Sequence, residues 1–232
     1  MKEKEYHREG FVSHDKLGAK YNMDYLLNKV VDFSINNKTT KDIDIIKNKD
    51  LDQLKAIIGI IAMSGCRVSE ALKLQYNDFI LEESDEGKQW LTLTLKNLKG
   101  GRGHKGSESL SIKRVPILLD PNSIFFKPFI KPILKWYITL SKWYDMGVWK
   151  NTDFEVFPNW TRFRVYYYFY KYLNINPHGL RKIFTTYLVV DRNYPIKVVQ
   201  RIIGHRDLKN LDYYINLRTE DIKKAILERK ED

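Results

Sequence analysis

The sequence predicts a mainly α-helical protein with one small antiparallel β-sheet, an α+β fold. Most of the 232 residues fall in segments whose apolar side chains recur at helical spacing. Residues 89–95 instead alternate between apolar and polar side chains, with Leu91, Leu93 and Leu95 on one face, which is typical of a half-buried strand. Since 43% of the residues are hydrophobic, the chain can build an ordinary core.

Three helices are expected before that strand. Residues 22–35 carry apolar side chains at helical spacing, and the polar stretch at 36–40 ends this helix. A core helix begins near Asp52, and its apolar run leaves almost no polar face, as in a helix buried on most sides. Gly65 breaks it, and a short helix begins near Val68.

The strand at 89–95 has its predicted partner at 113–117. The glycine-rich connection at 99–106 is too long for a tight turn and predicts an exposed hairpin loop. Pro177 and Pro195 suit the starts of helices. The remaining helical segments are predicted at residues 128–144, 161–173, 178–192, 195–203, 207–215 and 219–229.

Composition limits the class of protein. No repeat or low-complexity linker divides the chain, so residues 1–45 are expected to form a short N-terminal helical segment and residues 46–232 one domain. Lys and Arg exceed Asp and Glu by 40 to 29, and the net charge of +11 fits a partner made of phosphates. The single cysteine, Cys66, excludes an internal disulfide, and the longest apolar run, at 57–63, is far shorter than the ~20 residues of a membrane span. We therefore expect a cytoplasmic protein without a membrane partner.

Four short segments, far apart in the sequence, place polar residues where a purely structural pattern would place apolar ones. They span residues 64–72, 96–105, 178–181 and 204–217. Arg67 stands in the first of them, at a break between two helices, where unpaired backbone N–H groups allow an arginine to hold an anion. The alternative for Arg67 is an ion pair with Glu70, one turn further on.

His178 and Arg181 are three residues apart at a predicted helix start, so their side chains share one face. A guanidinium matches the two non-bridging oxygens of a phosphate, and an imidazole can move a proton near neutral pH. A capping histidine and a solvated arginine would explain the same two residues. Both interpretations stay open on this motif alone.

His205 and Tyr214 lie in the last segment. Gly204 suits the end of the helix at 195–203, so His205 is expected at a turn, although it could serve only to stabilise that helix end. Tyr214 follows nine residues later, next to Tyr213. Consecutive side chains on a helix are about 100° apart, so at most one of the two can face a given site, and packing is the alternative for both.

Together these segments resemble the tyrosine recombinase family, also called phage-type integrases, over its catalytic domain. Ser-Gly-Cys-Arg67-Val-Ser-Glu-Ala-Leu is similar to the family's first arginine box, and His178-Gly-Leu-Arg is similar to its His-x-x-Arg box. Ile-Ile-Gly-His205 resembles the Leu-Leu-Gly-His box, which the nucleophilic tyrosine follows by nine positions, and that count gives Tyr214. The match runs from about residue 50 to the end, and it suggests an enzyme of Xer type or from an archaeal mobile element.

The resemblance implies a site-specific DNA recombinase or integrase that works without metal, ATP or another cofactor. A tyrosine attacks phosphorus, a 3′-phosphotyrosine forms, and a free 5′-hydroxyl leaves. The implied roles are nucleophile for Tyr214, phosphate stabilisation for Arg67 and Arg181, proton removal for His178, a phosphate hydrogen bond for His205, and support of the arginine for Glu70.

The family also uses a hairpin lysine, ahead of an Arg-x-Val-Pro segment, as the acid that protonates the leaving oxygen. Here Arg114-Val-Pro is present, and the loop before it is longer than usual. The family's lysine commonly lies in a Gly-Lys-Gly-x-Lys stretch, and Lys99 resembles it best because Gly100 follows it directly. Lys96 and Lys105 are the alternatives.

The resemblance implies double-stranded DNA with an attachment or recombination site as partner, and further copies of the chain bound through the helix at 219–229. The family's N-terminal DNA-clamping domain is longer than the segment at 1–45, so a separate N-terminal partner domain is a further expectation. Three alternatives remain. They are a non-catalytic DNA-binding protein with a helix-turn-helix at 195–215, a truncated integrase remnant, and a type IB topoisomerase.

Overall fold

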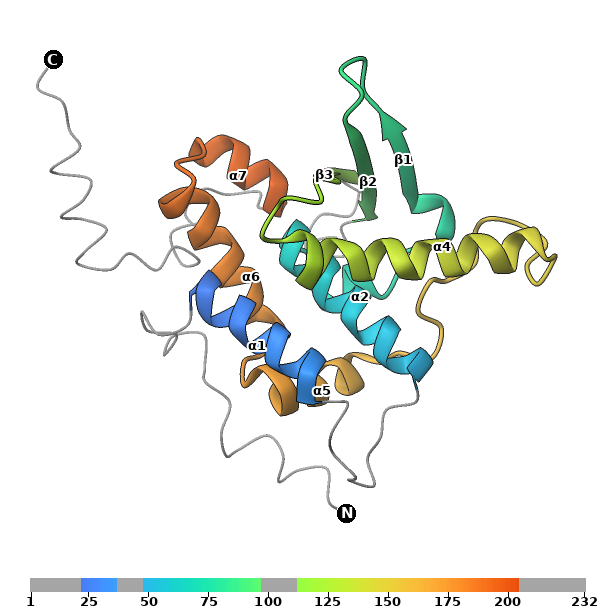
Figure 1. The fold of residues 1–232 in the computed structure, drawn as a ribbon, viewed down its shortest axis with the longest axis horizontal. Coiled ribbons are helices and arrows are strands. Elements are labelled where there is room, and N and C mark those ends of the chain that lie inside the picture. The colour runs from blue at the N-terminus through green and yellow to red at the C-terminus, as the bar shows by residue number, and fades with distance from the viewer. Residues whose placement is uncertain (1–21, 37–47, 97–111, 205–232) are drawn as a thin grey trace, which may run out of the picture.

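The computed structural model describes residues 22–36, 48–96 and 112–204 and has the predicted fold, mainly α-helical with one small antiparallel sheet (Figure 1). The helices are α1 (Met23–Asn36), α2 (Asn48–Ser64), α3 (Val68–Ala71), α4 (Lys131–Asp145), α5 (Arg162–Leu173), α6 (Pro177–Thr186) and α7 (Ile196–Ile203). The strands are β1 (Phe79–Glu83), β2 (Gln89–Lys96) and β3 (Ile112–Leu118). A 3₁₀ turn at Tyr76–Asp78 and π-helical segments at Phe126–Ile130 and Tyr187–Asp191 complete the described elements. No helix among the described residues is both long and apolar enough to cross a membrane.

Helix α2 forms the centre of the molecule, as its almost wholly apolar sequence predicted. Figure 1 shows it with the sheet on one side and α1 and α5 on the other. It packs against α4, α6 and the π-helical segment that precedes α4. Leu54, Ile57 and Ile61 have no exposed surface, so the helix is buried on several sides and holds the end that leads to Arg67 in a fixed place.

Gly59 is where α2 and the π-helical segment approach most closely. A Cβ atom built on Gly59 would lie 2.4 Å from the backbone carbonyl oxygen of Phe129, well inside van der Waals contact. Replacing Gly59 with alanine should therefore lower the free energy of unfolding by about 1–3 kcal/mol, since backbone must move to admit the methyl group. Urea unfolding followed by circular dichroism would measure this.

The direction in which Gly59→Ala changes the free energy of unfolding serves as the control. At an ordinary helix position the same change stabilises a protein by up to about 1 kcal/mol, because alanine has the higher helix propensity. A variant more stable than the wild type would contradict the close contact between α2 and Phe129.

The sheet has the order β1-β2-β3, and both pairs of strands are antiparallel. The predicted strands at 89–95 and 113–117 are confirmed as β2 and β3. Leu91 lies opposite Ile117 and Leu93 opposite Val115, and these four side chains are buried on one face. β1 was not predicted. It is an edge strand of the sheet, and most of its side chains are exposed.

The predicted helix boundaries after the sheet follow local capping. The side-chain oxygen of Thr161 accepts a hydrogen bond from the backbone N–H of Arg164 (3.2 Å), so Thr161 caps α5. Pro177 is the first residue of α6, and Pro195 directly precedes α7. Gly204 ends α7 in the left-handed conformation (φ +76°), which glycine adopts without strain.

Two predicted helices differ in detail from the structure. The segments at 128–144 and 178–192 were predicted as continuous α-helices, but the first begins and the second ends in a wider π-helical turn. Spacing of apolar residues does not distinguish one wide turn inside a helix, so the periodicity carried no sign of it. The predicted helices at 207–215 and 219–229 and the loop at 99–106 lie outside the described residues.

Candidate active site

Arg67 lies between the end of α2 and the start of α3, at the break that the sequence indicated. Its backbone N–H donates to Oε2 of Glu70 (2.9 Å), and its Nη1 donates to Oε1 of the same carboxylate (2.6 Å). The ion pair considered as an alternative for Arg67 is therefore present. The Glu70 side chain is only 5% exposed, so the carboxylate is a fixed partner that orients the guanidinium instead of a mobile surface group.

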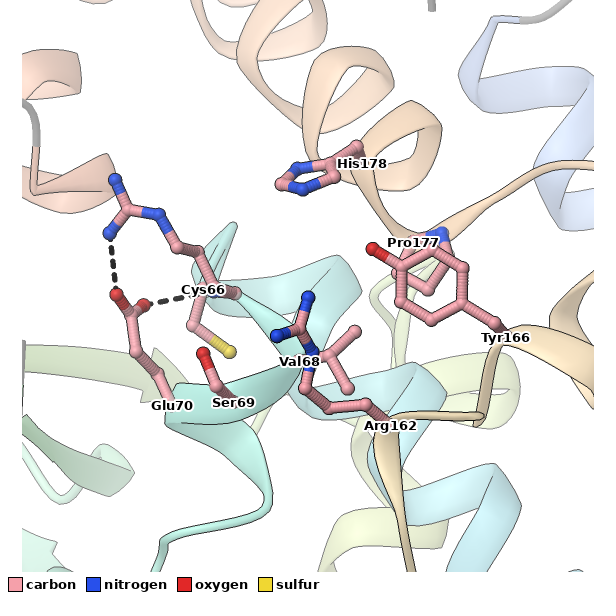
Figure 2. Close-up of a pocket in the computed structure, with 9 residues that line it drawn as sticks. Cys66, Val68, Ser69, Glu70, Arg162, Tyr166, Pro177 and His178 are labelled. Atoms are coloured by element: carbon pink, nitrogen blue, oxygen red, sulfur yellow. Dashed lines mark hydrogen bonds and ion pairs between the residues drawn. The ribbon is translucent and has the colours of Figure 1, made fainter. Parts of the chain in front are cut away.

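A cavity of about 370 Å³ opens beside this ion pair. Figure 2 shows that its lining comes from three parts of the chain. The turn into α3 contributes Cys66, Arg67, Val68, Ser69 and Glu70; α5 contributes Arg162 and Tyr166; and α6 contributes Pro177 and His178. The fold thus brings Arg67 and His178, which are far apart in the sequence, to one cavity.

His178 is half-buried at the start of α6 and does not cap it. The cap is Asn176, whose side-chain oxygen accepts a hydrogen bond from the backbone N–H of Gly179 (2.7 Å). The alternative of a capping histidine is therefore wrong. Figure 2 shows the imidazole facing the cavity from above Tyr166 and Pro177.

Arg181 is fully buried, with no exposed surface, so the alternative of a solvated arginine is also wrong. Its Nη1 donates to the carbonyl of Gly65, and its Nη2 donates to the carbonyl of Ile203 (2.9 Å). These bonds join the turn before Arg67 to the last residue of α7. Arg181 is not among the residues that line the cavity, and a direct contact with phosphate stays a prediction.

Comparison with known proteins points in one direction. No family model matches, but the chain is 25% identical over 190 residues to the tyrosine recombinase XerD of Rickettsia bellii, covering 75% of this chain and 55% of the relative. It is 26% identical over 177 residues to the tyrosine recombinase XerA of Pyrococcus horikoshii, covering 76% and 54%. This chain is related to the tyrosine recombinases. It spans about half the length of these curated relatives.

Solved structures of tyrosine recombinases share the fold. The XerH recombinase bound to a palindromic difH substrate, in a post-cleavage complex, matches with a TM-score of 0.58 and 22% identity over 90% of this chain and 53% of that chain. The crystal structure of XerA recombinase matches with a TM-score of 0.52 and 16% identity over 91% of this chain and 65% of that chain.

Of the three lysines considered for the acid of a tyrosine recombinase, only Lys96 is described. Its ammonium donates to Oε1 of Gln75 (2.9 Å) and lies 3.6 Å from Oδ1 of the buried Asp78. Lys96 is bound to these partners at the end of β2, and it does not line the cavity. Lys99 and Lys105 lie outside the described residues, as do His205 and Tyr214.

A half-buried lysine that no sequence motif singled out lies next to the turn that leads to Arg67. Lys113 donates from Nζ to the carbonyl of Ser64 (3.0 Å). Burial, together with the positive charges of the neighbouring Arg181 and Arg67, lowers the pKa of Lys113 to about 8, although Cys66 and Glu70 act in the raising direction. A sequence signal existed, because Lys113 occupies the same alternating face of its strand as the buried residues two and four positions on.

Cys66 should be a poor nucleophile in the folded protein. The thiol is 1% exposed, and burial raises its pKa from 9.0 to about 11. At pH 8 this lowers the thiolate fraction about 100-fold, and reactivity should rise only as the pH approaches 11. The measurement is the rate of reaction with a disulfide reagent at pH 8, native and in urea. Equal rates in both states would contradict this prediction.

Proposed function

We propose that this chain cleaves and rejoins DNA as a site-specific recombinase of Xer type, through a 3′-phosphotyrosine on Tyr214. The observation that carries the proposal is the meeting of Arg67 and His178 at one cavity, in a fold shared with tyrosine recombinases. The Arg67 and His178 motifs, which are far apart in the sequence, thus line one cavity that a phosphate could enter. The Xer relatives support the reaction class.

In the proposed reaction the Tyr214 oxygen forms a bond to phosphorus while the bond from phosphorus to the 5′-oxygen breaks. His178 would assist removal of the tyrosine proton, and the hairpin lysine, for which Lys99 is the first candidate, would supply a proton to the 5′-oxygen. The phosphodiester is exchanged for a phosphotyrosine ester of similar energy, so rejoining needs no ATP or other cofactor.

The charge that develops on the non-bridging oxygens would be met chiefly by Arg67, which Glu70 holds in place. Preorganised donors of this kind are often the largest catalytic contribution, because they need no reorganisation during the reaction. His205 would donate to a phosphate oxygen. Arg181 would add positive charge next to the turn, and its two carbonyl bonds account for two of the five donors of a guanidinium.

DNA is the proposed partner, since the XerH structures are complexes with difH substrate. A net charge of +11 supports binding to a phosphate backbone. Residues 46–232 are proposed as the catalytic domain, and the helix at 219–229 as the contact with further copies of the chain. A separate N-terminal partner domain remains part of the proposal, as does a cytoplasmic location, where DNA substrates are found.

The test is covalent capture. The purified chain would be incubated with nicked duplexes tiled across the DNA that flanks its gene, because a nick lets the short fragment that carries the new 5′-hydroxyl leave and traps the protein on DNA. We expect an adduct that survives boiling in detergent and disappears after protease treatment. Binding to the duplexes without any adduct would favour the alternative of a non-catalytic DNA-binding protein. Relaxation of supercoiled plasmid of unrelated sequence would favour a type IB topoisomerase.

A further inference from the structure

A second arginine, which none of the recognised motifs includes, lines the same cavity as Arg67. Arg162 is the first residue of α5. In Figure 2 its side chain extends from α5 toward Val68, and the side chain of Tyr166 extends from the same helix. The hydroxyl of Tyr166 points to the side on which Pro177 and His178 lie. Arg162 and Tyr166 thus face the same space as the proposed phosphate ligands.

The two arginines of the cavity differ in their electrostatic partners. Arg67 is paired with the buried carboxylate of Glu70, so its charge is largely offset. Among the side chains that the structure describes, no carboxylate forms a salt bridge with Arg162. Of the two arginines that line the cavity, Arg162 is thus the one without a carboxylate partner among the described residues. An anion entering the cavity would be attracted to that wall as well as to Arg67.

The cavity is larger than one phosphate group requires. About 10–15 Å³ of such space is enough for one water-sized group, so 370 Å³ holds many more groups than the five heavy atoms of a phosphate. A phosphate together with its attached sugar would also fit. The space therefore suits a length of sugar–phosphate backbone better than an isolated phosphate.

We propose that Arg162, assisted by the Tyr166 hydroxyl, binds the backbone phosphate next to the scissile one on the substrate strand. This assignment rests on the proposed function. A side chain that stabilises the transition state has to be held in place before the reaction begins, as Glu70 holds Arg67. Arg162 is exposed and has no such carboxylate among the described residues, so it suits a contact that contributes equally to bound substrate and transition state.

The test separates binding from cleavage in the full-length chain. Binding of a short fluorescein-labelled duplex of random sequence would be measured by anisotropy at several salt concentrations. For Arg162→Gln we expect affinity to fall about tenfold and the slope of log K against log salt to shrink by about 0.9, the value for one lost phosphate contact. Arg162→Lys should restore the slope, because it keeps the charge, but only part of the affinity.

Lys150→Gln is the matched control, since Lys150 is exposed, lies in the segment after α4 and does not line the cavity. It should change affinity less than twofold. Adduct formation at saturating nicked DNA should proceed at nearly the wild-type rate in Arg162→Gln. Unchanged affinity and slope in that variant would overturn the proposal, and so would a rate that falls more than tenfold at saturation. Binding is measured on uncut DNA, so a wild type that binds but forms no adduct would count against the proposed function and leave this test intact.

Discussion

Replacing Tyr214 with phenylalanine should abolish the covalent protein–DNA adduct while leaving DNA binding unchanged. The substitution removes one oxygen, and with it the only atom that could form the proposed bond to phosphorus. The shape and apolar surface of the ring are kept, so folding and binding should be unaffected. The measurement is the amount of detergent-resistant adduct on the nicked duplex, alongside anisotropy with the uncut one.

Tyr213→Phe is the matched control, because Tyr213 and Tyr214 are adjacent and chemically identical. It should form the adduct at the wild-type rate. An adduct that survives in Tyr214→Phe but is lost in Tyr213→Phe would reassign the nucleophile. An adduct present in both variants would show that Tyr214 is not required as the nucleophile and would remove the positional argument based on His205.

Loss of Arg67 should have the second largest effect on formation of the adduct. Arg67→Ala should slow adduct formation at saturating DNA by about 10² or more, as found when a preorganised donor to a developing oxyanion is removed. The change also leaves the buried carboxylate of Glu70 without its cation, so thermal unfolding must be checked beside the rate. The double variant Arg67→Ala, Glu70→Gln removes that unpaired charge.

Arg192→Ala is the control for Arg67→Ala, since it also removes an arginine, from an exposed position outside the cavity lining. Its rate should match the wild type. The single-turnover rate of both Arg67 variants should be low even when the double variant has recovered stability. A rate within a few-fold of the wild type in a folded Arg67 variant would exclude Arg67 from the proposed site.

Most of the fold could be predicted because local signals agreed with tertiary packing. Thr161 fixed one helix start through its side chain, and Gly204 fixed one helix end through its backbone. β1 was missed because it is a short edge strand with one buried residue, so no alternation of apolar residues marks it. Its pairing with β2 is a tertiary property that the spacing of residues does not express.

The candidate site was only partly predictable. Short motifs located Arg67 and His178 because each stands in a recognisable local context. Arg162 has no such context, and its place in the cavity depends on how α5 packs beside α3 and α6. The burial of Arg181 could not be predicted for a similar reason, since its two carbonyl partners come from the turn after α2 and from the end of α7, which lie outside its own helix.

The bond from Arg181 to the carbonyl of Ile203 has a consequence for the reach of the proposed nucleophile. It fixes the last residue of α7, from which the chain continues toward Tyr214. Positions 203 and 214 are eleven residues apart, so even a fully extended chain could place the tyrosine no further than about 40 Å from that anchor. Arg181 therefore fixes the point from which the reach of Tyr214 is measured, a role that its charge alone would not reveal.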